Sequence, residues 1–130
     1  MTPRLLPREA IEAIFRNQAS RFGTASQSYE WQALADLYDR LADLSLTEIN
    51  LSSLTAHVGH AIAVDGPFGN LNRGTAAVAV EAMVELNGMV FSAANAEITM
   101  AFVDLGAGRM SIEGLAEWVD AHMTSSENAA

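Results

Sequence analysis

Residues 66–75, with the sequence GPFGNLNRGT, are the part of the chain whose residue types best suit chemistry. Their glycines let the backbone turn tightly and approach a ligand closely, and Pro67 fixes one backbone angle. The apolar segment that follows predicts a helix, whose first N–H groups have no partner inside the helix. Such a loop at a helix N-terminus suits a bound anion. The alternative, from spacing alone, is a plain turn in which Asn and Gly residues cap two helices.

Two apolar segments flank this loop and predict the helices that position it. Residues 75–86 (TAAVAVEAMVEL) are almost wholly apolar, which is typical of a helix surrounded by other helices. Residues 51–64 favour a second helix, with Ser52 or Ser53 as its cap, that ends where the loop begins. We therefore expect the loop to join two helices, of which 75–86 is the more buried.

The remaining pattern predicts an all-α fold. Four further helices are expected: residues 7–22 closed by Gly23, residues 29–43, a segment from Asn95 or Ala96 to Asp104 or Leu105, and a last helix capped by Ser111. The inner face of the second of these is expected to carry Trp31, Leu34, Leu37, Tyr38 and Leu41. Residues 1–130 then form a single helical bundle, with a core at about residues 7–122 and a disordered tail at residues 123–130.

Residues 45–50 lie between two helical patterns and are too short to form a stable helix of their own. They mix polar and β-branched residues, which predicts a short extended flap made of Thr47, Glu48, Ile49 and Asn50. The alternative is an ordinary connector between two helices.

Composition narrows the classes of function. Half of the 130 residues are hydrophobic, which favours a folded domain, and the absence of cysteine excludes disulfides and thiolate metal sites. The net charge of −9, with seven Arg and no Lys, repels phosphate backbones and anionic membranes, so we expect neither nucleic acid nor membrane as a partner. No apolar stretch reaches the roughly 18 residues that span a bilayer, and we expect a cytoplasmic protein.

The three histidines are weak candidates for chemistry. His57 and His60 stand three residues apart, a spacing that can place two ring nitrogens beside one metal, but no acidic or third imidazole ligand lies within a turn of them. A helix surface or core edge is the favoured location for both, and His122 is expected to be an exposed helix-end residue. His60 precedes Gly66 by six residues, about 9 Å along a helix, which is too far to act within the loop.

The 66–75 loop resembles the central motif of the Fic/Doc (Fido) family. That motif reads His, any residue (often Pro), Phe, any residue, an acidic residue or Asn, Gly or Ala, Asn, Gly or Lys, Arg, and usually Thr. The positions that match are Pro67, Phe68, Asn70, Asn72 and Thr75. The positions that depart are Gly66 in place of the His, Leu71 in place of the small residue and Gly74 in place of the Arg, with Arg73 one position early.

Other parts of the chain resemble the Doc branch of this family. The first helix begins at a Pro and ends in Arg21-Phe22-Gly23, and the interval from Asn72 to the Asn87-Gly88 pair matches the one in Doc-type sequences. Residues 109–113 are similar to the start of the final Doc helix. The resemblance therefore spans from Pro7 to about His122.

The resemblance implies a mechanism and a set of site residues. Fic enzymes transfer a nucleotidyl group from ATP to a protein hydroxyl, and Doc transfers a phosphoryl group to elongation factor Tu. In both, the motif His is the general base, the loop amides cradle phosphates, the acidic or Asn residue helps to hold Mg²⁺, and the Arg neutralises charge. The flap at residues 47–50 would align the target by strand addition. The implied nucleotide or anion contacts are Phe68, Gly69, Asn70, Asn72, Arg73, Gly74 and Thr75, with Asn70 as a weak Mg²⁺ ligand.

Two functions of different classes follow. We favour a catalytically impaired Fic/Doc-like protein that acts by binding a protein partner, because the positions of the base and of the phosphate-binding Arg are both glycine. The partner would be an antitoxin, a homologous protomer or a translation factor. The alternative is an active ATP-dependent nucleotidyl- or phosphotransferase with an unusual motif, and a third is a helical domain of unrelated ancestry. If the first holds, Gly66→His with Gly74→Arg is expected to restore some activity.

Overall fold

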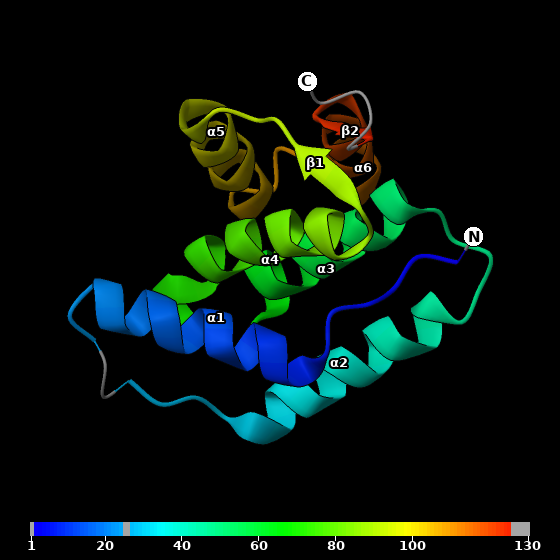
Figure 1. The fold of residues 1–130 in the computed structure, drawn as a ribbon. Helices are drawn as coiled ribbons and strands as arrows, with labels where there is room; N and C mark the ends of the chain where they lie inside the picture. The colour runs from blue at the N-terminus through cyan, green and yellow to red at the C-terminus, as the bar shows by residue number, and fades with distance from the viewer. Residues whose placement is uncertain (1, 25–26, 126–130) are drawn as a thin grey trace.

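The computed structural model describes residues 2–24 and 27–125, which form six α-helices and one two-stranded sheet (Figure 1). The all-α class predicted from the sequence is confirmed. The helices are α1 (Arg8–Arg21), α2 (Trp31–Ser45), α3 (Leu51–Asp65), α4 (Asn72–Leu86), α5 (Asn95–Gly106) and α6 (Ile112–Ala121). A 3₁₀ turn, η1 (Gly69–Leu71), precedes α4, and the strands are β1 (Met89–Phe91) and β2 (Met123–Ser125).

The pair α3 and α4 forms the centre of the bundle. In Figure 1 these two helices lie between α1 and α2 on one side and α5 and α6 on the other, and α3 packs against α2, α4, α5 and α6. The sequence predicted residues 75–86 as the most buried helix. The structure shows instead that α3 shares this position, with as many buried residues as α4.

Close packing at this centre depends on Gly59 of α3. A Cβ atom built there would lie 2.7 Å from Val80 Cγ2 and 3.3 Å from Leu115 Cδ2. Gly59 therefore lets α4 and α6 approach α3 at the same point, and this approach is what makes α3 as buried as α4.

The start of α3 corrects two expectations from the sequence. Asn50 is the cap, because its side chain accepts a hydrogen bond from the Ser53 N–H at 2.9 Å, and neither Ser52 nor Ser53 has that role. Residues 46–50 form no strand; the Thr47 N–H donates to the Leu44 carbonyl and the Ile49 N–H to the Thr47 carbonyl. The predicted extended flap is thus a hydrogen-bonded connector. At α6 the predicted cap is confirmed, since Ser111 Oγ accepts from the Gly114 N–H.

The N-terminal segment packs along the bundle before α1 begins. The Arg4 N–H donates to Asn87 Oδ1 at 2.7 Å, and Asn87 Nδ2 donates back to the Arg4 carbonyl at 2.9 Å. The Tyr38 hydroxyl donates to the carbonyl of Leu6, whose side chain is buried. The core therefore starts before residue 7. Trp31, expected to face inward, is instead 68% exposed.

The end of the described chain returns to the body of the protein. β2 pairs antiparallel with β1, so that Met89 lies opposite Ser125 and Phe91 opposite Met123. The predicted disordered tail is therefore wrong for Met123–Ser125, and its remainder, residues 126–130, lies outside the described residues. None of the helices in residues 2–24 and 27–125 is both long and apolar enough to cross a membrane.

The crowding at Gly59 gives a stability prediction. Gly59→Ala should lower the free energy of unfolding by about 1–3 kcal/mol, because a methyl group there overpacks the junction with Val80 and Leu115. The matched control is Gly106→Ala in α5, whose nearest neighbour would be Arg73 Nε at 4.0 Å. We expect that control to stay within about 0.5 kcal/mol of the parent. Urea unfolding followed by circular dichroism measures both, and equal midpoints would contradict the packing argument.

Candidate functional site

The loop between α3 and α4 is anchored by Phe68, which is fully buried. Its ring stacks on Phe15 of α1, with centroids 4.6 Å apart and planes 16° apart, and meets Tyr29 edge to face at 5.1 Å. Such pairs stabilise by about 0.5–1.5 kcal/mol beyond the area they bury. Phe68 was a predicted ligand contact, and its position assigns it to the core.

The loop is also held from inside by Asn72, the first residue of α4. Asn72 Oδ1 accepts from the Phe68 N–H at 2.8 Å, and Nδ2 donates to the Gly66 carbonyl at 3.0 Å. A second side chain, Gln27, donates from Nε2 to the Phe68 carbonyl at 3.0 Å. The resemblance to the Fic/Doc motif implies that the Asn72 side chain contacts phosphate. In this structure its amide group instead holds the backbone of the loop in shape.

At two glycines of the loop, Gly66 and Gly74, neighbouring atoms fill the space that a side chain would take. A Cβ atom on Gly66 would meet the Ile62 carbonyl oxygen and would lie 2.6 Å from Asn72 Oδ1. Gly66 has an ordinary extended conformation, φ −66° and ψ 154°, so space and not backbone angle selects glycine there. A Cβ atom on Gly74 would lie 2.5 Å from Oε1 of the buried Gln18 in α1. A side chain at Gly66 would press on the backbone at the end of α3, whereas one at Gly74 would require the Gln18 side chain to shift.

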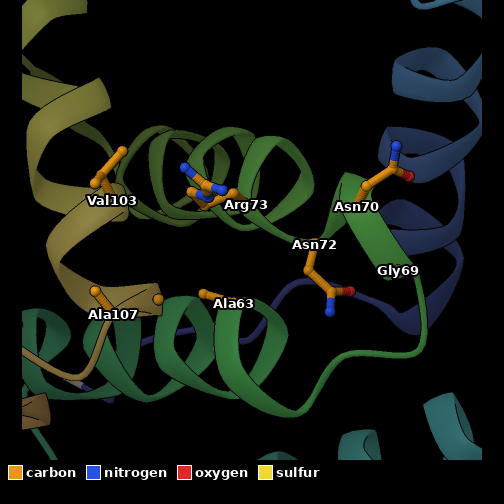
Figure 2. A pocket seen from close by; sticks show the side chains of 8 residues that line it. Ala63, Gly69, Asn70, Asn72, Arg73, Val103 and Ala107 are labelled. Carbon is orange, nitrogen blue, oxygen red and sulfur yellow. The ribbon is translucent and has the colours of Figure 1, made fainter.

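Beside the loop lies a cavity of about 350 Å³, which we call the Arg73 cavity (Figure 2). Figure 2 shows the Arg73 side chain extending from α4 toward Val103 of α5. The lining residues come from α3, η1, α4 and the end of α5: Ala63, Gly69, Asn70, Asn72, Arg73, Val103, Gly106 and Ala107.

Four of the seven predicted contact residues therefore meet at one cavity: Gly69, Asn70, Asn72 and Arg73. Phe68 and Thr75 are buried away from it, and Gly74 faces Gln18. The α5 residues that close the cavity were missed. They are small or apolar residues at the end of a helix, so only the tertiary packing reveals them, although the Gly106-Ala107-Gly108 break marks where that helix stops.

The charge at the Arg73 cavity favours an anion. The guanidinium group of Arg73 is exposed, and in the described part of the chain no carboxylate pairs with it. The cavity lies between the N-terminal end of α4, where the helix dipole is positive, and the C-terminal end of α5, where it is negative. Among residues 2–24 and 27–125 no acceptor forms a hydrogen bond with the N–H groups of Gly69 and Asn70, both of which belong to residues that line the cavity. These groups together can hold a phosphate or carboxylate.

The histidines lie elsewhere. His57 and His60 line a separate cavity of about 310 Å³ next to Arg40 of α2 and Asp65. Burial, followed by the neighbouring His60, lowers the pKa of His57 below its usual value. Within the described ranges, no three His, Asp or Glu side chains gather in a way that could hold a metal ion.

The predicted flap residues line a third cavity of about 620 Å³, together with Thr2 and the end of α2. Thr47, Glu48 and Asn50 are exposed there, while Ile49 is half-buried and packs against the core. This cavity shares no residue with the Arg73 cavity, so the structure does not bring the flap and the loop residues into one cavity.

No family model matches the sequence, and no curated protein matches it either.

The two asparagines of the loop give a matched pair of variants. Asn72→Ala should lower the free energy of unfolding by about 1–3 kcal/mol, because it leaves the Phe68 N–H and the Gly66 carbonyl without their partner. Asn70→Ala removes an exposed side chain that makes no hydrogen bond within the described residues, and we expect a change below about 0.5 kcal/mol. Chemical denaturation compares the two, and an equal loss in both would show that Asn72 does not brace the loop.

Proposed function

We propose that the protein is a Fic/Doc-type domain without transferase chemistry that acts by binding a protein partner and keeps a weak anion site at the Arg73 cavity. The support is the arrangement of α3, a glycine-rich loop and α4, in which a buried Phe68 and the helix N-terminus stand in the order that the motif requires. The chain shares with the Doc branch the Asn87-Gly88 pair after α4, and here Asn87 fastens the N-terminal segment.

The observation that carries the loss of chemistry is at Gly66. This residue stands where the motif places its general base, and the space for a side chain is filled by the Ile62 carbonyl and Asn72. No histidine replaces it, because none of the three lines the Arg73 cavity. A positioned base contributes about 10²–10⁴-fold to rate, so its absence removes most of the transfer activity.

Anion binding is expected to survive this loss. Arg73 reaches the cavity although it stands one position before the motif Arg, and backbone amides bind anions whatever their side chains. Asn70 also lines the cavity and is the residue that would meet Mg²⁺ carried by a nucleotide. ATP with Mg²⁺ is therefore the ligand to test, as a weakly bound anion.

The proposed partner is a protein whose surface complements the charge and the exposed apolar residues of this chain. The chain has a net charge of −9, which attracts basic surfaces and repels nucleic acid. Trp31 and Met100 are each 68% exposed, and both residue types are enriched where proteins meet. An antitoxin, a homologous protomer or a translation factor with a basic surface fits this description.

The proposal predicts no transfer to a target protein. The purified protein is incubated with a bacterial lysate and ATP labelled at either the α- or the γ-phosphate, which separates nucleotidyl from phosphoryl transfer. We expect no labelled protein at either position, because Gly66 supplies no base. A Fic enzyme with the complete motif is the positive control. Robust labelling of a lysate protein would overturn the proposal and establish the alternative, an active transferase with an unusual motif.

The anion site has its own prediction. Titration with Mg·ATP should shift the backbone amide signals of Gly69 and Asn70 with a dissociation constant on the order of 1 mM. Arg73→Gln should weaken this binding about tenfold, because it removes the cation of the cavity. Arg40→Gln, which removes an equal charge at the separate histidine cavity, should leave it unchanged. Equal weakening by both variants would show that only the total charge matters.

A further inference from the structure

His122, the residue that follows α6, is held by two hydrogen-bond acceptors at once. Its Nδ1 lies 2.7 Å from the carbonyl oxygen of Trp118, and its Nε2 lies 3.0 Å from Oε2 of Glu97 in α5. A carbonyl and a carboxylate only accept hydrogen bonds, so both ring nitrogens must donate. Only the doubly protonated, cationic ring can do so. The residue expected to be an exposed helix end has a side chain that is only 20% exposed.

We propose that protonation of His122 fastens the start of α5 to the end of α6, and that loss of this proton releases α5, which forms one wall of the Arg73 cavity. The proposal concerns the position of that wall and does not depend on what the cavity binds.

The contact joins three segments at one point. Glu97 Oε1 also accepts from the Ala94 N–H at 2.8 Å, which fixes the first turn of α5. The backbone carbonyl of His122 accepts from both the N–H and the hydroxyl of Ser92, just after β1. The His122 ring lies 4.7 Å from the ring of Trp118. A neutral ring would turn a lone pair toward one of its two acceptors, so one of these links would be lost.

Glu97 is the charged group that faces His122 from another element. β1, β2 and Ser92 carry no charged side chain, and α6 itself carries only the acidic residues Glu113, Glu117 and Asp120. The hydrogen bond to the Trp118 carbonyl, and then Glu97, hold the pKa of His122 above its usual value against the opposing effect of burial. The Ala94 N–H, and then His122, hold the pKa of Glu97 below its usual value.

These directions fix the pH window of the contact. The contribution of His122 to stability is complete below its unfolded pKa of 6.5 and is lost as the pH rises through its higher folded pKa. The contribution of Glu97 is complete above its unfolded pKa of 4.5 and is lost as the pH falls through its lower folded pKa. The ion pair is therefore strongest at mildly acidic pH and opens on the alkaline side.

α5 connects the His122–Glu97 contact to the Arg73 cavity. Its first turn holds Glu97, and its last turn supplies Gly106, with Val103 one turn before it. Between them, α5 buries Ala101, Phe102 and Leu105 in the core, and Ile98 of its first turn packs against the core while partly buried. When the contact with His122 is lost, the first turn of α5 keeps only the Ala94 cap and the packing of Ile98, and in this proposal the helix shifts about its buried residues and moves the wall of the cavity.

The test follows the His122 ring and the α5 amides by NMR from about pH 5.5 to about pH 8.5. We expect His122 to titrate above 6.5, and the amide signals of Val103, Gly106 and Ala107 to shift with the same midpoint. Glu97→Gln keeps an oxygen for the Ala94 N–H but removes the charge, and should lower the midpoint of His122. The control Glu117→Gln removes one charge from α6 instead of α5, and should leave the midpoint of His122 unchanged.

His57 serves as an internal standard, because burial moves its pKa in the opposite direction. A His122 midpoint at or below 6.5, or one that Glu97→Gln does not lower, would overturn the ion pair as the cause. Cavity amides that do not follow the His122 midpoint would overturn the link from α5 to the Arg73 cavity.

Discussion

The packing of Phe68 against Phe15 and Tyr29 fixes the loop on which the candidate site depends. Phe15 and Tyr29 themselves meet edge to face at 5.1 Å, so three rings from α1, the segment before α2 and the loop form one cluster. The guanidinium group of Arg16 covers this cluster, 5.2 Å from the centre of the Phe15 ring. Because Phe68 is fully buried, the next residues must turn back to the surface within η1, and this turn sets Asn70 and Arg73 at the cavity.

The same tight packing limits what the loop can do chemically. The side-chain amide of Asn72 is already hydrogen-bonded to the backbone at Gly66 and Phe68. The Ile62 carbonyl oxygen fills the space beside Gly66. The exchange of Gly66 for His, expected from the motif to restore activity, therefore requires the end of α3 to move. A side chain at Gly74 would likewise press on Gln18, so the two glycines are part of the packing as well as gaps in the motif.

The sequence was sufficient for the six helices, and it also singled out four of the residues that line the Arg73 cavity. Periodic apolar residues predicted all six helices, and the glycines predicted the loop, because both signals are local. The cap of α3 was misassigned because Asn50, Ser52 and Ser53 are all good capping residues in a row. β2 was missed because a three-residue strand exists only through its pairing with β1, and the α5 wall of the cavity because Val103 and Ala107 reach the loop only through tertiary packing.

Arg73, which is exposed and has no carboxylate partner in the described part of the chain, lies beside the ends of two helices. Arg73 lies between the N-terminal end of α4 and the C-terminal end of α5, and its Nε is 4.0 Å from where a Cβ of Gly106 would be. The C-terminal end of a helix carries partial negative charge, and its attraction for a nearby guanidinium group stabilises the protein by an amount on the order of 0.3–1 kcal/mol. An anion bound in the proposed site would compete with that end of α5 for Arg73. The affinity of the proposed anion site would therefore depend on where α5 lies.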